Sequence, residues 1–300
     1  MAKKNNYWIY ELGVLLCCML WGIGNPLVKV GLRTLTTFYY SLIRFSFGLV
    51  LFLLLFPRRI FRAVRRDNLK HVLIISFFNA VEYIFGTLAL SLSAATVASF
   101  LMSLSVIFVP FIAYFAAGKR ISPALIPAIA LSVAGTYLMC GNMGQVSFGW
   151  GEVIALLCSV SMACGMVFAN KYGDENIDLS YLAAMQCLLA AVLSLPLFLL
   201  SGEAWIPFAS YNRDAVLCVV FTVVGSTCLT FVLQNLTLRH LSPTVASITF
   251  ASESVFTMIF SYLILREALP VIGVLGGMLI LGGVVLATLI QNGAIGKKKG

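Results

Sequence analysis

The sequence predicts an all-α integral membrane protein with ten transmembrane helices, organised as two inverted five-helix repeats. The first observation is composition: 61% of the 300 residues are hydrophobic and 10% are charged, whereas soluble domains average about 45–50% apolar and about 25% charged residues. The second is the length of the apolar runs, which are long and unbroken instead of short and alternating as in a β-barrel. The third is an internal repeat. Together they exclude a soluble globular fold.

Ten apolar segments approach the length of a membrane-spanning helix, which needs about 20 residues. They lie at residues 11–32, 37–56, 71–91, 95–116, 124–141, 150–171, 179–200, 214–236, 242–264 and 270–290. Lys3 and Lys4 before the first apolar run resemble the start of a signal peptide, but the run continues past Pro26 and further spans follow. We therefore interpret this run as the first membrane helix.

The basic residues indicate how the chain is oriented in the membrane. When loops are assigned alternately, the side of the N-terminus collects most of them, including the cluster from Arg58 to Lys70, and the other side collects only Lys29, Arg33, Arg213 and Arg266. Both termini are therefore expected in the cytoplasm and the protein in the cytoplasmic (inner) membrane. Topology also explains the net charge of +9, so no nucleic-acid partner is expected.

Cysteine and histidine give no sign of metal or catalytic chemistry. The eight cysteines lie inside apolar runs without a CxxC pair or a histidine at ligand spacing, which favours helix packing. The two histidines, His71 and His240, lie at helix ends, and there is no Walker A loop to bind ATP. We expect no metal, no cofactor and no enzyme activity, although a membrane-embedded enzyme is kept as an alternative of a different class.

An internal repeat appears when residues 90–138 are shifted by 148 positions onto residues 238–286. The block TVAS at residues 96–99 then coincides with TVAS at residues 244–247. The first helices also correspond, at a shift of 141 positions that places Glu11 on Glu152. Each half holds five spans, which predicts two domains, residues 1–145 and residues 146–300.

Five is an odd number of crossings, so the second repeat must be inverted relative to the first. Inverted repeats can exchange conformations around a central site and open it alternately to each side of the membrane. The repeat therefore predicts alternating-access transport.

The motifs resemble those of the drug/metabolite transporter superfamily, EamA-like branch, over essentially the whole chain. They are LWGIGNPLVK at residues 20–29, IRF at 43–45, AATVAS at 94–99, SPTVAS at 242–247 and LREAL at 265–269. Two positions depart from the family pattern: Lys119 replaces a glutamate, and Glu253 occupies a place where proline is common. The resemblance implies a ten-helix transporter of small metabolites, often amino acids or other amphiphilic solutes, and leaves the substrate unnamed.

Three charged residues are expected near the middle of the membrane, where a charge is energetically costly and therefore indicates a functional or structural role. They are Arg44, Glu82 and Glu253, whereas Lys29 lies close enough to a helix end to extend to the membrane surface. Arg44 and Glu82 have similar depths, so they can form either a structural ion pair or contacts with substrate. One arginine cannot neutralise two carboxylates, so at least one of the two is predicted to carry a proton or to bind a cationic group. Glu253 is the first candidate for this role and Glu82 the second.

Helical spacing places further polar and aromatic residues beside these charges. Asn79, Glu82 and Tyr83 share one helix face, Trp21 and Asn25 share another, and Gln234 belongs to a polar stripe on the eighth span. Hydrogen bonds between helices are the alternative reading of these polar side chains. Trp21 either packs structurally or stacks on substrate beside a Gly-x-Gly-Asn-Pro stretch that can unwind. The predicted substrate-binding residues are Trp21, Asn25, Arg44, Asn79, Glu82, Tyr83, Gln234 and Glu253.

The predicted function is secondary transport, with export expected, of an amino-acid-like or amphiphilic solute. A nucleotide-sugar or lipid-linked-sugar carrier of the same superfamily is the alternative, but its phosphates need several basic residues in the cavity, and only Arg44 and Lys29 are available. The expected partners are the lipid bilayer and a small-molecule substrate, with possible proton coupling. A monomer and a homodimer are both compatible with the sequence.

Overall fold

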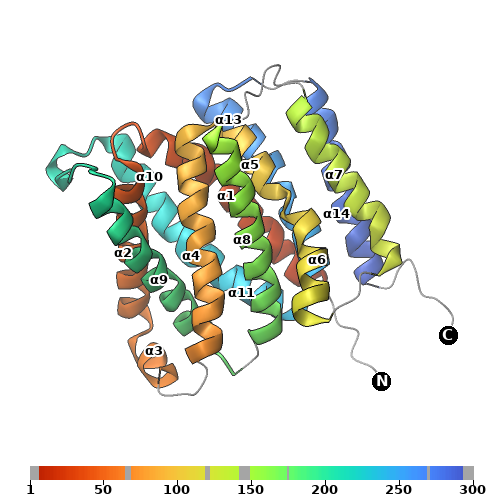
Figure 1. The fold of residues 1–300 in the computed structure, drawn as a ribbon, viewed down its shortest axis with the longest axis horizontal. Helices are drawn as coiled ribbons and strands as arrows, with labels where there is room; N and C mark the ends of the chain where they lie inside the picture. The colour runs from red at the N-terminus through yellow and green to blue at the C-terminus, as the bar shows by residue number, and fades with distance from the viewer. Residues whose placement is uncertain are drawn as a thin grey trace.

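A computed structural model describes residues 7–64, 69–118, 122–141, 149–173, 176–268 and 271–292. Within these ranges the regular elements are all helices, and most run side by side as a bundle (Figure 1). The predicted domain boundary between residues 145 and 146 and the departure at Lys119 lie outside the described ranges.

The described residues of the first half form seven α-helices. They are α1 (Trp8–Gly31), α2 (Thr37–Leu55), α3 (Pro57–Ala63), α4 (Leu69–Leu92), α5 (Ala95–Ser103), α6 (Ser105–Ala117) and α7 (Ile126–Gly141). A 3₁₀ turn at Pro123–Leu125 leads into α7. The short helix α3 was not expected, and it begins with a proline at its first position, where the missing N–H leaves no hydrogen bond unmade.

The second half repeats this order with one more interruption. It contains α8 (Trp150–Tyr172), α9 (Leu179–Leu200), α10 (Arg213–Val223), α11 (Thr230–His240), α12 (Pro243–Phe250), α13 (Ser252–Leu265) and α14 (Val271–Gln291). A 3₁₀ turn at Phe208–Ser210 precedes α10, and a π-helical turn at Val224–Leu229 joins α10 to α11. Asp178 and Asn212 cap the starts of α9 and α10, since each side chain accepts a hydrogen bond from a first-turn N–H.

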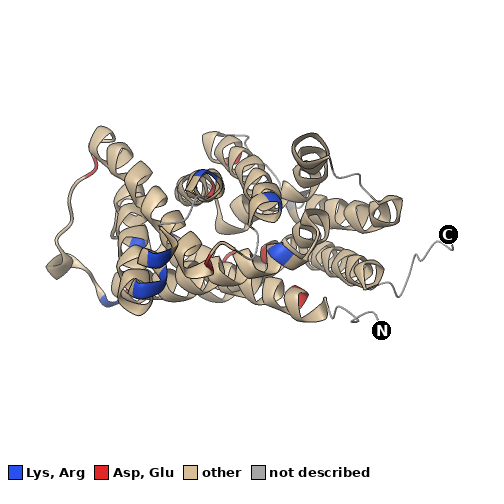
Figure 2. Ribbon diagram, turned by 90° about the horizontal axis from the view of Figure 1, so that it is seen from below, with Lys and Arg blue, Asp and Glu red and all other residues tan. Residues whose placement is uncertain are grey.

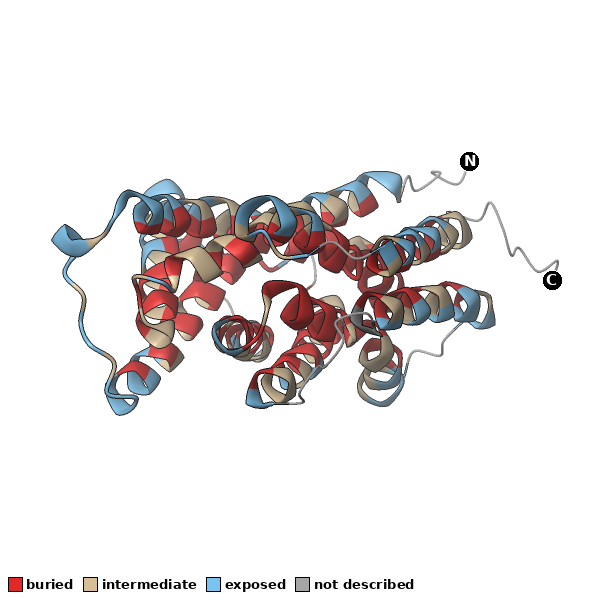
Figure 3. Cartoon of the chain, turned by 90° about the horizontal axis from the view of Figure 1, so that it is seen from above, coloured by how far each residue is buried: buried red, intermediate tan, exposed pale blue. Residues whose placement is uncertain are grey.

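Among the described residues, nine helical segments are long and apolar enough to cross a membrane, and Pro123–Met139 adds a shorter one. In order they match the ten predicted spans, so the predicted fold class is confirmed. Large apolar side chains such as Leu54, Phe115 and Leu200 are exposed on the outside of the bundle. Buried residues gather in its interior (Figure 3), and charged residues are sparse along the helices (Figure 2). This distribution suits a bundle surrounded by lipid.

The two halves interlock instead of standing apart. The main helix pairs are α1 with α13, α4 with α8, α2 with α9 and α7 with α14, and each pair joins the first half to the second. In the last pair a Cβ added at Gly276 would meet the carbonyl oxygen of Gly135 at 2.4 Å. Glycine therefore permits the close approach of these two helices. The interior of the bundle is consequently shared by both halves.

Two predicted spans are interrupted at matching places. The fourth span breaks at Leu104, between α5 and α6, and the ninth breaks at Ala251, between α12 and α13. Serine hydroxyls next to both breaks bond to backbone carbonyls: Ser103 Oγ donates to the carbonyl of Ser99, and Ser254 Oγ donates to that of Ala251. Such bonds compete with the helical ladder and bend helices. Hydropathy does not register this effect, so the breaks were not predicted.

Candidate functional site

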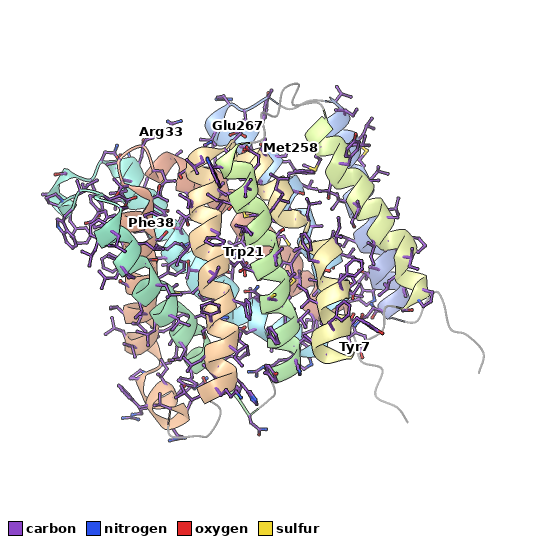
Figure 4. All side chains as sticks on the ribbon, viewed as in Figure 1. Tyr7, Trp21, Arg33, Phe38, Met258 and Glu267 are labelled. Atoms are coloured by element: carbon purple, nitrogen blue, oxygen red, sulfur yellow. The ribbon has the colours of Figure 1, made fainter. Side chains whose placement is uncertain are left out.

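A buried cavity lies between the two halves, around the level of Trp21 in the middle of the bundle (Figure 4). Its volume is about 50 Å³, which is room for a few water molecules at roughly 10–15 Å³ each. Its walls come from both halves of the chain: Trp21, Asn25, Arg44, Glu82, Tyr83, Gly86, Thr87, Leu90, Met102, Cys158, Met162, Ser226 and Glu253. We call it the central cavity.

Trp21 forms part of the wall and is held by two hydrogen bonds. Its indole Nε1 donates to the carbonyl of Ser226 and to Thr230 Oγ1, both at 3.2 Å. Its ring stacks on Phe250 with 5.4 Å between ring centroids. The side chain is therefore fixed in orientation while it faces the cavity, and its stacking on substrate stays a prediction.

Arg44 is anchored to the π-helical turn of the opposite half. Its Nε donates to Thr227 Oγ1 at 2.7 Å, and its Nη2 donates to the carbonyl of Ser226 at 2.9 Å. The guanidinium carbon lies 5.1 Å from the centroid of the Tyr83 ring, within range of a cation–π contact. A π turn leaves a carbonyl outside the regular ladder, and here both Arg44 and Trp21 use the carbonyl of Ser226. An ion pair with Glu82, one of the two alternatives that the sequence left open, is not formed among the described residues.

Asn25 connects three helices through one amide. Its Nδ2 donates to Ser99 Oγ at 2.7 Å, to Glu253 Oε1 at 2.8 Å and to Thr257 Oγ1 at 3.1 Å. These acceptors lie on α5, the first part of the fourth span, and on α13, the second part of the ninth span. Glu253 is buried and has a neutral donor as its partner, so its carboxyl is not paired with a cation in this arrangement.

Glu82 and Tyr83 bring α4 to the cavity. The Tyr83 ring meets Trp21, Phe45 and Phe231 at ring-centroid distances of 6.3, 5.6 and 5.0 Å. Glu82 is buried, and the structure shows no ion pair for it within the described part of the chain. The cavity thus holds one guanidinium, two carboxyls and an aromatic wall.

The structure separates two of the predicted residues from the rest. Trp21, Asn25, Arg44, Glu82, Tyr83 and Glu253 line the central cavity. Asn79 and Gln234 instead line a second, much smaller cavity, which we call the amide cavity, and Glu82 lines both. The remaining polar residues of the amide cavity, Gln186 and Asn235, were not predicted.

The sequence also missed several wall residues of the central cavity. Ser226 contributes through a backbone carbonyl that is available because of the π turn. No pattern in the sequence predicts this turn. Cys158, which was interpreted as a packing residue, lines the cavity, and its Sγ lies 3.1 Å from the carbonyl oxygen of Glu82. It is one of the seven free thiols among the described residues.

The Gly-x-Gly-Asn-Pro stretch does not unwind in this structure. Helix α1 continues through Pro26 to Gly31. A Cβ at Gly22 would lie 2.3 Å from Phe256 Cβ, and one at Gly24 would lie 2.5 Å from Ser226 Oγ. The glycines serve close packing of α1 against the second half instead of a helix break.

A wider cavity of about 590 Å³ opens at the end of the bundle opposite Tyr7, where Figure 4 labels Arg33 and Glu267. We call it the vestibule; Lys29 lines it and donates to the carbonyl of Ser93. The Glu267 carboxylate accepts from Thr96 Oγ1 at 2.6 Å and from the first N–H groups of α5. Leu90 lines both the vestibule and the central cavity, so it separates them.

Comparison with known families decides the class of protein. The sequence model of the EamA-like transporter family matches residues 8–141 and again residues 149–289. The chain belongs to the EamA-like transporter family. The two matches divide the chain as the internal repeat does, and they identify it as a multi-pass membrane transporter.

Similar proteins agree with this assignment. An uncharacterized transporter of Archaeoglobus fulgidus is 25% identical over 279 residues, 93% of this chain and 85% of its own length. The uncharacterized transporter YoaV of Bacillus subtilis is 26% identical over 283 residues, 92% of this chain and 96% of its own. One solved crystal structure has the same fold, with a TM-score of 0.77 at 19% identity, covering 96% of this chain and 99% of the other.

Proposed function

We propose that this EamA-like protein is a secondary transporter that moves a small amino-acid-like solute across the cytoplasmic membrane by alternating access. The observation that carries the proposal is the composition of the central cavity, in which Arg44 and two carboxyls share one small buried space. Among the described residues, neither the guanidinium nor the two carboxyls have a partner of opposite charge within ion-pair distance. A zwitterionic solute supplies both missing charges.

The carboxylate of the solute would bind Arg44. The Nε and Nη2 groups of Arg44 are held by Thr227 and Ser226, which fixes the plane of the guanidinium. No described residue accepts a hydrogen bond from its second terminal nitrogen, Nη1. A positioned guanidinium with a free donor is well suited to a carboxylate.

The ammonium group would bind the carboxyls on the other walls. Glu82 comes from α4 and Glu253 from α13, so the two halves of the chain each contribute one. Trp21, Tyr83, Met102 and Met162 supply an apolar and aromatic surface for the rest of the solute.

Access to the cavity would come from the vestibule by movement of Leu90. The central cavity has a volume of only about 50 Å³, so a solute needs space that this side chain occupies between the two chambers. The shared walls of the two repeats support alternating access, because exchange of their shapes would close the vestibule and open the opposite end. With the termini in the cytoplasm, the vestibule faces outward. Export of the solute stays a prediction.

The cavity does not favour a sugar-nucleotide substrate. A diphosphate carries at least two negative charges and is bound through several basic groups. Arg44 is the one cationic residue among the described residues that line the central cavity, and two carboxyls stand close by.

A thermal-shift panel tests the proposal on purified protein. Amino acids should raise the melting temperature at millimolar concentration, because a ligand that binds the folded state stabilises it. Amines and organic acids, which satisfy only one half of the site, should shift it less. Arg44→Lys should remove most of the amino-acid response. Equal shifts from all three classes, or an unchanged response in Arg44→Lys, would contradict the proposed mode of binding.

A further inference from the structure

We propose that the amide cavity is a binding site for one small monovalent cation, with Na⁺ as the probe, and that it adjoins the solute site and shares Glu82 with it. The cavity lies between α4, α8, α9 and α11 and has a volume of about 10 Å³, the space of about one water molecule. An organic solute does not fit there, so the occupant is a single atom or a water.

Two buried amide oxygens define the chemistry of this cavity. Asn79 Oδ1 and Gln234 Oε1 have no hydrogen-bond partner among the described residues, and both side chains are at least nine-tenths buried, with 3% and 4% exposed. A buried polar atom without a partner is costly, at about 1–3 kcal/mol. Two such atoms on the wall of one cavity indicate that the cavity holds something that both can bind.

A neighbouring amide pair is already satisfied and helps to fix the walls. Asn235 Nδ2 donates to Gln186 Oε1 at 2.8 Å, and Gln186 Nε2 donates to Asn235 Oδ1 at 3.4 Å. The amide nitrogen of each of these two residues therefore donates to the amide oxygen of the other. This exchange joins α9 to α11 and leaves the two unpartnered oxygens to an occupant of the cavity.

The charge of the occupant follows from Glu82. Its carboxyl lines the amide cavity, and the described structure provides it with no ion pair. Carboxylate and amide oxygens are the ligands that hard cations such as Na⁺ and Ca²⁺ take in proteins. One carboxylate balances one positive charge, so the set favours a monovalent cation over a divalent one.

Gly165 leaves the space open. It lies on α8 and lines the amide cavity, and a Cβ added there would lie 3.8 Å from Glu82 Oε2 and from Phe78 Cβ. These are ordinary van der Waals contacts. A methyl group at this position would therefore fill part of the cavity without forcing the helices apart.

Binding of a cation at this site can be coupled to transport, and this part of the inference rests on the proposed function. Glu82 lines both the amide cavity and the central cavity. A cation in one chamber and a solute ammonium in the other would compete for the same carboxyl. Na⁺ should therefore weaken solute binding, as an exchanger requires.

Melting temperatures of the purified full-length protein test the site without any transport assay. Na⁺ is titrated against choline at constant pH and ionic strength. Na⁺ should raise the melting temperature by about 2 °C or more in a saturable way, and choline should not. Equal behaviour of the two salts would overturn the proposal and leave a water molecule as the occupant.

Variants identify the site. Glu82→Gln removes the charge, and Gly165→Ala fills the space while leaving every ligand in place; both should lose the Na⁺ response. The matched controls are Glu11→Gln, a buried carboxyl outside both cavities, and Gly282→Ala, a helical glycine with nothing within 4 Å of an added Cβ. Both controls should keep it. A Gly165→Ala protein that responds to Na⁺ like the parent, or a loss of response in the controls, would overturn the assignment.

These outcomes are separable from the proposed function. If Na⁺ stabilises the parent but no amino acid does, the cation site stands and the solute proposal fails. If amino acids stabilise the parent but Na⁺ does not, the reverse holds.

Discussion

The side-chain amide of Asn25 lies 2.8 Å from Glu253 Oε1, across the interface between the two halves of the chain. The same nitrogen lies 2.7 Å from Ser99 Oγ on α5. Asn25 thus links the first helix to both interrupted spans at the wall of the central cavity. When one half moves against the other, this hydrogen bond must either break or move with both helices. The contact can therefore couple solute binding in the central cavity to the conformational change.

Removal of the Asn25 amide should cost stability as well as function. Asn25→Ala leaves Glu253 and two hydroxyls without their donor, a loss of about 1–3 kcal/mol for buried polar groups. Asn25→Ala and Glu253→Ala, each of which removes the hydrogen bond between the two side chains, should also be non-additive, with a coupling of about 0.5–3 kcal/mol. A double-mutant cycle of unfolding free energies measures this. Additive effects would show that the two residues act independently.

Arg44→Lys should abolish most solute binding while the protein still folds. Lysine keeps the charge but loses the planar fork that reaches Thr227 and Ser226 together. We expect affinity to fall by about ten- to a hundredfold, the value of a hydrogen bond to a charged group. Equilibrium binding on folded protein measures the change, and equal affinity in the variant and the parent would make the arginine purely structural.

Glu253→Gln should remove the dependence of transport on the proton gradient. Glutamine keeps the shape and can still accept from Asn25, but it does not titrate. Vesicles with an imposed pH difference should therefore transport at a rate independent of that difference. If the variant retains the parent's pH profile, the coupling proton is carried elsewhere, with Glu82 as the next candidate.

Glu267→Gln should destabilise the start of α5. The carboxylate accepts hydrogen bonds from the N–H groups of Ala95 and Thr96, where the helix has no side-chain cap of its own. Loss of a charged cap costs about 0.5–2 kcal/mol. Chemical denaturation should show this loss, and Glu203→Gln, which removes the equivalent carboxylate from the start of α2, should behave alike. No loss in either variant would mean that these carboxylates do not cap the helices.

The predicted topology can be read with reporter fusions. Fusions after Gly141 and Gly202 should report the outside, and fusions after Lys70 and Gly300 the cytoplasm, because the basic residues concentrate on the latter side. A reporter at Lys70 found outside would reverse the orientation of the vestibule.

Composition and the repeat were sufficient to predict the fold, because membrane helices depend on length and hydrophobicity more than on local detail. The division of the polar residues was not predictable. Asn79 and Glu82 share a helix face, but Asn79 lies three residues, about 4.5 Å, nearer the start of α4, which is enough to place it in the other cavity. The spacing of residues along the sequence predicts which helix face a side chain occupies, but not which of the two cavities it lines.

The helix irregularities were equally hidden from the sequence. The π turn that frees the carbonyl of Ser226 arises from backbone hydrogen bonding inside a segment that hydropathy shows as one continuous span, and Arg44 takes its partners there instead of at Glu82. Equal depth along two helices suggested an ion pair, but the rotation of each helix about its axis decides which side chains meet.

Counterflow in proteoliposomes tests the central claim most directly. Vesicles loaded with an unlabelled amino acid that stabilises the protein are diluted into a trace of the labelled one. An alternating-access carrier should accumulate label transiently, Arg44→Lys should reduce the initial rate by about tenfold or more, and Glu11→Gln should match the parent. If loaded and empty vesicles take up label equally, the central cavity does not exchange solute between the two sides, and the proposed function is wrong.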